Sequence, residues 1–277
     1  MQAKLKRLLI SLVAVVGLVG DALANGSANG WQFFQPSRTG YSARTSIGYH
    51  YGYPAYGPSE SNVSAQFLFN VASGNLTDLV GGSEVLVVNT TPTFNQTIGG
   101  LHAGISPGIL YDANTEYHRK GSASTVMSAG TSDFTLEIWF SSTAAGDAML
   151  VTTRGWVSGD GYEVEILPGS TSINSYWQAT DNTNVTSTKS YGAATPLDGN
   201  PHKIRITGDR NGNLTTYLDE TSLGTTAFAA LDGKDLAADD VTMAVAIGAG
   251  AKTLTGKLYE VRLSLNLTNN STPTWLQ

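Results

Sequence analysis

The amino-acid sequence predicts an all-β fold in which two antiparallel sheets pack face to face. Three observations support this prediction. Charged residues are only 14% of the chain while glycines number 31, which is typical of short strands joined by many turns. Apolar and polar side chains alternate with a period of two in several runs, and Asn/Asp-Gly turn pairs separate these runs. No helical periodicity extends over three turns after residue 24.

Residues 1–24 have the three parts of a secretory signal peptide. Lys4, Lys6 and Arg7 precede the apolar run 8–19, and an Ala-Leu-Ala cleavage site ends at Ala24. The apolar run is shorter than the roughly 20 residues that a membrane-spanning helix needs. We therefore expect cleavage and export rather than anchoring.

The chain that remains after cleavage has no cysteine and no second apolar run of spanning length. Its fold must then be held by a hydrophobic core rather than by disulfides. The formal net charge is −6 for the whole chain and becomes −8 once residues 1–24 are removed. We expect a secreted, extracellular or cell-surface protein with no membrane span and no nucleic-acid partner.

Residues 25–61 differ in composition from the rest and are predicted to form an irregular arm. The arm contains Trp31-Gln-Phe-Phe, followed by a Gly/Pro/Tyr-rich stretch between Tyr41 and Tyr56. Its glycines and prolines oppose regular structure, and its aromatic side chains favour contacts. Two interpretations stay open: a loop over the sandwich, or a segment for self-association that docks on another subunit or surface.

The clearest strands follow one another from residue 134 onward. In 134–140, Phe134 and every second residue after it point to one face, while Thr135, Glu137 and Trp139 point to the other. The same alternation occurs in 162–166, 202–206 and 259–265. Turn chemistry lies between them, at 158–161, 209–213 and 232–233. Each strand is predicted to have one apolar and one polar face.

These strands occur in an order that resembles the laminin-G-like, concanavalin A-like jelly-roll family. The matching stretches are 133–140 (DFTLEIWF), 198–204 (DGNPHKI), 209–219 (DRNGNLTTYLD) and 256–263 (GKLYEVRL). Pro201 stands where the family usually has Trp, and Glu220 where Gly is common. The resemblance implies a two-sheet jelly-roll domain over 62–268, followed by a short tail, 269–277. This fold serves lectins, adhesion modules, glycosidases and virion fibres, so it does not determine the function.

One carboxylate pair invites a catalytic interpretation. Glu163 and Glu165 lie two residues apart on a predicted strand, roughly 7 Å apart on one face, a spacing that glycoside hydrolysis can use. The alternative is a charge ladder with Lys203, Arg205 and Arg262 as cross-strand partners, and we favour it. We expect no catalytic residue and no enzymatic activity.

Sugar recognition needs an aromatic platform beside amide and carboxylate groups. Tyr176 is adjacent to Trp177 in a probable strand, so only one of the two can face outward. Trp156 stands in a loop, which makes it the better candidate for the platform, although a tryptophan that covers the core edge is the commoner case. The candidate ligand-binding residues are Trp156, Trp177, Asp181, Asn182 and Tyr191.

Metal sites are weakly indicated. The four histidines show no zinc-binding spacing, and there is no cysteine. Loop carboxylates are suitable calcium ligands, and Asp160 and Asp181 are the candidates, with turn stabilisation as the alternative role. We expect no required cofactor and treat calcium as possible.

Ten asparagines begin an Asn-x-Ser/Thr sequon. They indicate either a glycosylated surface or merely an Asn- and Thr-rich composition. The candidates within the predicted domain are Asn62, Asn75, Asn89, Asn95, Asn184, Asn213 and Asn266.

Two functions fit the sequence. The first is a secreted, non-catalytic recognition module for carbohydrate or another cell-surface ligand, favoured by the resemblance and by the Trp/Tyr/Asn-bearing loops. The second is a structural subunit of an extracellular filament, matrix or virion surface that uses the arm 25–61.

Overall fold

The structure is a computed structural model of the chain. It describes residues 63–69, 74–80, 84–90, 92–96, 108–113, 115–155, 159–193, 195–245 and 252–265. The predicted signal peptide, the arm 25–61 and the tail 269–277 lie outside the described residues. The structure therefore does not test the predictions for those three segments, and they stay predictions.

The described residues form an all-β sandwich of two antiparallel sheets, as the sequence predicts. Strands of the first sheet are β1 (Val63–Leu68), β4 (Thr93–Gln96), β5 (Gly108–Tyr111), β7 (Phe134–Ser142), β12 (His202–Gly208), β13 (Asn213–Leu218), β14 (Thr221–Ala227) and β16 (Gly256–Leu265). Strands of the second sheet are β2 (Leu76–Thr77), β3 (Val85–Asn89), β6 (Tyr117–Arg119), β8 (Ala148–Thr152), β9 (Gly161–Leu167), β10 (Ser172–Gln178), β11 (Asn184–Ser190) and β15 (Thr242–Met243).

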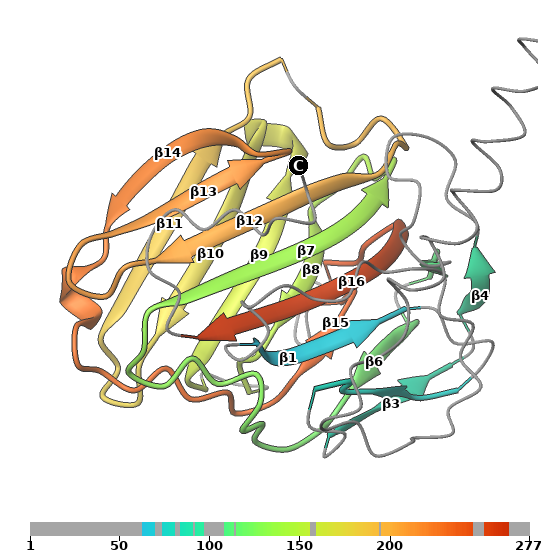
Figure 1. Cartoon of the computed structure of the whole chain (residues 1–277). Helices are drawn as coiled ribbons and strands as arrows, with labels where there is room; N and C mark the ends of the chain where they lie inside the picture. Colours follow the sequence, from blue (N-terminus) through green and yellow to red (C-terminus); the bar gives the residue numbers. More distant parts are fainter. Residues whose placement is uncertain are drawn as a thin grey trace, which may run out of the picture. The chain divides into compact units, whose positions relative to one another are not determined.

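The first sheet has the order β14-β13-β12-β7-β16-β5-β4, and β1 pairs with the other end of β16. The order of the second sheet is β11-β10-β9-β8-β15-β6-β3-β2. Figure 1 shows the two as layers, with β12, β7 and β16 crossing in front of β9, β10 and β11. At one edge β11 meets β14, where Ser187 Oγ lies 2.9 Å from Thr226 Oγ1. This contact joins the edge strands of the two sheets.

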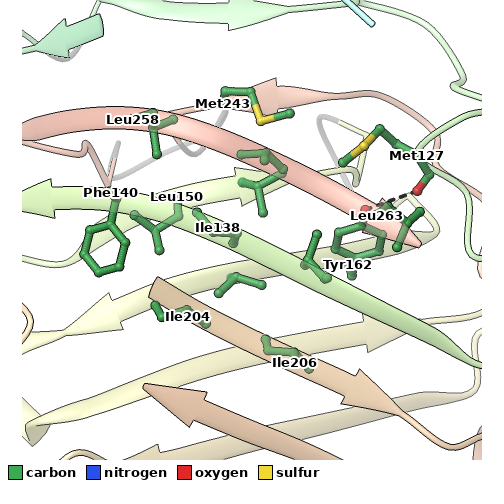
Figure 2. Close-up of a cluster of buried hydrophobic side chains, with 14 of the residues drawn as sticks. Met127, Ile138, Phe140, Leu150, Tyr162, Ile204, Ile206, Met243, Leu258 and Leu263 are labelled. Carbon is green, nitrogen blue, oxygen red and sulfur yellow. Dashed lines mark hydrogen bonds between the residues drawn. The ribbon is translucent and has the colours of Figure 1, made fainter. Parts of the chain in front are cut away.

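The core lies between the sheets and uses the inward side of each alternating strand. Ile138, Ile204 and Leu263 come from the first sheet, while Leu150 and Tyr162 come from the second, and all five are buried. Figure 2 shows these side chains meeting, with the Tyr162 hydroxyl donating to the Met127 carbonyl at 3.2 Å. The predicted strands at 134–140, 162–166, 202–206 and 259–265 are thus confirmed. Their inward residues are also as predicted except at Tyr259, where a register shift between Leu258 and Glu260 puts Leu258 in the core instead.

The outer face of the first sheet differs from the sequence prediction. Glu137 and Trp139 lie on this face, but each is only 1% exposed. Lys203 Nζ and Arg262 Nε donate to the Glu137 carboxylate at 3.3 and 2.8 Å. Both cations also lie over the Trp139 ring, 5.3 and 5.4 Å from its centroid. The expected solvated face is instead a buried ionic cluster, which we call the Glu137 cluster: Glu137, Trp139, Lys203 and Arg262.

Candidate functional site

The outer face of the second sheet carries the arrangement closest to a binding site. On β9, Tyr162 and Ile166 point into the core, so the alternate residues point outward. On β10, Ile173 and Trp177 belong to the core, which likewise turns their neighbours outward. We call the resulting surface the β9–β10 face: Arg154, Glu163, Glu165, Asn174, Tyr176 and Gln178.

Tyr176 is the aromatic centre of the β9–β10 face. Its ring is half-buried, and the Arg154 guanidinium lies 4.3 Å from the ring centroid. The tyrosine hydroxyl donates to Gln178 Oε1 at 2.7 Å, and Arg154 Nη2 donates to the same oxygen at 3.3 Å. Gln178 in turn donates through Nε2 to Asn182 Oδ1 at 3.2 Å. These contacts hold an aromatic ring, an amide and a cation together on one surface.

Carboxylates and a further amide lie beside the tyrosine. Glu163 is opposite Tyr176 in the β9–β10 register, and its carboxylate is 3.5 Å from Arg154 Nη1. Glu165 accepts a hydrogen bond from Asn174 Nδ2 at 2.8 Å and forms an ion pair with Lys252. Both carboxylates are therefore bound by cations or amides, which is the arrangement of a charge ladder rather than of an acid/base pair.

The partners of these two carboxylates differ from those expected. The cross-strand partners expected from the sequence are Lys203, Arg205 and Arg262, but those three residues lie on the first sheet. There they pair with Glu137 and Glu220. The reason is topological, because β9 is hydrogen-bonded to β8 and β10 and has no neighbour from the first sheet.

Acidic loop residues border the β9–β10 face at one end. The Asp160 backbone N–H donates to Asp239 Oδ2 at 2.8 Å, and burial together with the charges of Asp239 and Asp235 raises the pKa of the Asp160 carboxyl. Asp181 forms an ion pair with Lys234, and this contact, with hydrogen bonds from Thr183, lowers the pKa of Asp181 to about 2. The loop end is thus negatively charged around Asp160.

The same loop end does not assemble a metal centre from described side chains. Within the ranges that the structure describes, no group of three or more His, Cys, Asp and Glu residues could hold a metal ion. Asp181 Oδ1 instead accepts the Thr183 backbone N–H at 3.0 Å, the turn-stabilising role considered as the alternative. Calcium at Asp160 or Asp181 remains a prediction.

Two predicted ligand residues are corrected by their burial. Trp177 is 0% exposed and lies stacked between Phe134 and Tyr162, with ring centroids 4.7 and 4.8 Å away. Tyr191 is only 6% exposed. Trp177 has the parity of Ile173 on β10 and therefore points inward, and Tyr191 belongs to the same core cluster. Neither side chain offers a ligand platform.

The remaining predicted ligand residues are placed differently. Asn182 touches the β9–β10 face through Gln178, and Asp181 adjoins it. Trp156 lies outside the described residues. Arg154 and Gln178 are not among the site residues predicted from the sequence. Gln178 could have been found, because it lies two residues after Tyr176 on the same strand and therefore on the same face.

Four of the candidate sequon asparagines are exposed: Asn75, Asn89, Asn184 and Asn213. Asn95 lies in β4, and Asn62 and Asn266 lie outside the described residues. Exposure permits glycosylation, which stays a prediction. Among the helices of the described residues, none has the length and apolar character to cross a membrane.

Comparison with known proteins identifies a fold but no family. No family model matches the chain, and no curated protein matches it. The laminin-G-like resemblance therefore stays a prediction. The chain does match solved structures, and it spans about half the length of those described below.

Three of these structures are binding domains of clostridial toxins. The binding domain of Paraclostridial Mosquitocidal Protein 1 has a TM-score of 0.51 and 14% identity, over 74% of this chain and 48% of that one. The binding domain of botulinum neurotoxin DC in complex with rat synaptotagmin II has a TM-score of 0.53 and 12% identity, over 74% and 48%. The ligand binding domain of botulinum neurotoxin serotype D in complex with N-acetylneuraminic acid gives 0.51 and 12%, over 76% and 49%. At these identities the likeness shows a shared sandwich fold.

Proposed function

We propose that this protein is a secreted, non-catalytic carbohydrate-binding module and that the β9–β10 face is its binding surface. The observation that carries the proposal is the half-buried Tyr176 ring, which lies on one sheet face with the half-buried Asn174 amide and Glu163 carboxylate and is held from beneath by the buried Gln178 amide. Sugars present apolar C–H faces and many hydroxyls, so a ring beside fixed donors and acceptors matches their chemistry.

The rigidity of this surface supports the proposal. Side chains of the face are fixed by contacts such as Tyr176 hydroxyl to Gln178 at 2.7 Å and Thr188 Oγ1 to Asn174 Oδ1 at 2.8 Å. Three paired strands, β9, β10 and β11, hold their backbones. A ligand would then meet groups already in position, which reduces the ordering cost of binding.

Two further observations are consistent with binding rather than catalysis. The solved structures with this fold that are named above are binding domains, two of them in complex with a protein receptor or a sugar. On the face itself, Glu163 and Glu165 are engaged by Arg154 and Lys252. We therefore assign no catalytic role to these carboxylates.

A glycan array tests the proposal, with the chain from Asn25 onward as the probe. Tyr176→Ala should weaken binding to the glycans retained by the native chain by about tenfold or more, which corresponds to about 1.4 kcal/mol. Tyr217→Ala is the matched control, because Tyr217 is also half-buried and carries Arg205 over its ring at 3.6 Å, but on the first sheet. Absence of binding to every glycan, or equal losses in both variants, would overturn the proposal.

The structural-subunit alternative depends on the arm 25–61, which lies outside the described residues. It stays a prediction, and sizing of the chain with and without the arm tests it. A monomer in both cases would count against it.

A further inference from the structure

We infer that the β9–β10 face selects neutral glycans and excludes sialylated, sulfated and other anionic ones. This inference rests on the proposed function and adds the charge class of the ligand. The ligand class inferred here differs from that of one matched domain of the same fold, which is in complex with the acidic sugar N-acetylneuraminic acid.

The cation at the centre of the face is already engaged. Arg154 donates through Nε to the Gly159 carbonyl at 3.2 Å and through Nη2 to Gln178 at 3.3 Å. Its Nη1 lies 3.5 Å from the Glu163 carboxylate, and its guanidinium lies over the Tyr176 ring. An acidic sugar that sought this guanidinium would have to displace a carboxylate of the protein.

The two lysines beside the face are neutralised in the same way. Lys234 forms an ion pair with Asp181, next to Asn182. Lys252 forms an ion pair with Glu165 and lies 3.9 Å from Asp147. Neither lysine offers a cation without an acidic neighbour.

The border of the face carries three carboxylates, those of Asp160, Asp235 and Asp239. In the described part of the chain, no lysine or arginine lies within ion-pair distance of Asp160, Asp235 or Asp239. The raised pKa of Asp160 reflects burial and the nearby acidic charges, with Arg154 acting in the opposite direction. In the sequence, residues 156–158 just before this border include no charged side chain.

A negative ligand would approach this border against its field. Two like charges repel each other in water, and they repel more strongly where solvent is excluded. The net charge of −6 over the whole chain has the same sign. Neutral sugars meet no such penalty and can use the Asn174 amide and the Tyr176 ring.

The test is a glycan array in which each neutral oligosaccharide is printed beside its sialylated and its sulfated form. The neutral form should bind at least about tenfold more tightly at low ionic strength, and the difference should shrink as salt screens the carboxylates. Equal or tighter binding of the acidic forms would overturn the inference but leave the proposed function standing. Silence of all forms would overturn the proposed function itself.

A charge-removing variant locates the effect. Asp160→Asn should raise binding of the sialylated forms about two- to threefold and leave the neutral forms unchanged. The substitution is mild because Asp160 contacts Asp239 through its backbone N–H. Asp112→Asn is the matched control, since Asp112 is exposed in the turn after β5 of the first sheet. An equal effect of both variants would show that the net charge of the protein, rather than the charge at the border of the face, weakens the binding of acidic glycans. That result would contradict the inference.

Discussion

At the scale of single residues, His118 shows how the sandwich accommodates a polar group in its core. The side chain is fully buried, with the Tyr111 hydroxyl donating to its Nδ1 at 2.7 Å and its Nε2–H donating to the Gly74 carbonyl at 3.0 Å. Because a carbonyl can only accept, the proton sits on Nε2 and the ring is neutral. Burial lowers the pKa of His118 from its ordinary 6.5 to about 4, while the bond to Gly74 acts in the opposite direction.

This histidine should make the protein less stable in mild acid. Between pH 7 and pH 5 the unfolded chain takes up a proton at His118 that the folded chain refuses, so the free energy of unfolding falls by about 2 kcal/mol. The test is the difference in unfolding free energy between the native chain and His118→Gln, measured by urea unfolding at both pH values, and this difference should shift by about 2 kcal/mol between pH 7 and pH 5. His202 and Glu260, whose pKa values are raised in the folded chain, stabilise the fold in mild acid, but they are present in both chains and cancel. An unchanged pH dependence in the variant would contradict this explanation.

The Glu137 cluster gives a second prediction at this scale. Arg262→Met removes one of the two cations that contact the buried Glu137 carboxylate, and we expect a loss of about 3–5 kcal/mol in unfolding free energy. Arg205→Met is the matched control on the same sheet face. Its partner Glu220 has a side chain 35% exposed, so that change should cost less than about 1 kcal/mol. Chemical denaturation compares the two, and equal losses would show that burial does not govern the cost.

At the scale of strands, alternation predicts the long elements and leaves others undetermined. β7, β9, β12 and β16 are long enough for a period of two to be read, and their inward residues are as predicted except at the irregularity of β16, where Leu258 replaces Tyr259 in the core. β2 and β15 have two residues each, too few for any pattern. In β10, Tyr176 and Trp177 are both aromatic and could each lie on the inner or the outer face of the sheet. Only Ile173 indicates that the odd-numbered residues of this strand point inward.

Contacts between side chains on neighbouring strands are harder to predict from one sequence than the strands themselves. The register that places Arg205 and Arg262 opposite Glu137 depends on the sheet order β12-β7-β16, which joins strands far apart along the chain. The same limit applies to the candidate site. Arg154 follows β8, and its place over Tyr176 of β10 results from the pairing of both strands with β9.

The turn before β9 makes a prediction about an element boundary. Gly161 has φ +118°, and a Cβ there would lie 2.9 Å from the Thr153 carbonyl oxygen and against the Thr153 hydroxyl. Gly161→Ala should therefore lower the free energy of unfolding by about 2–3 kcal/mol. Gly146→Ala should be close to neutral, because no atom lies within 4 Å of its built Cβ. Thermal unfolding of the two variants checks this. A Gly161 variant as stable as the Gly146 variant would show that a side chain at position 161 causes no strain.

At the scale of the whole sandwich, the two outer faces have different chemistry. The first sheet carries the buried Glu137 cluster and a half-buried ring, Tyr217, which lies beside the charged Arg205–Glu220 pair. The second sheet presents a half-buried aromatic ring with amides and engaged carboxylates around it. Because recognition needs accessible groups that are already ordered, the second face is the one we expect a ligand to use.

The most direct measurement of this claim is the location of a bound glycan by backbone amide chemical shifts. With an array-selected neutral oligosaccharide added to the chain from Asn25 onward, the largest shifts should fall on residues of β9, β10 and β11, and Tyr176→Ala should abolish them. Shifts confined to β7, β12 and β16 would place the ligand on the first sheet. That result would contradict the assignment of the β9–β10 face.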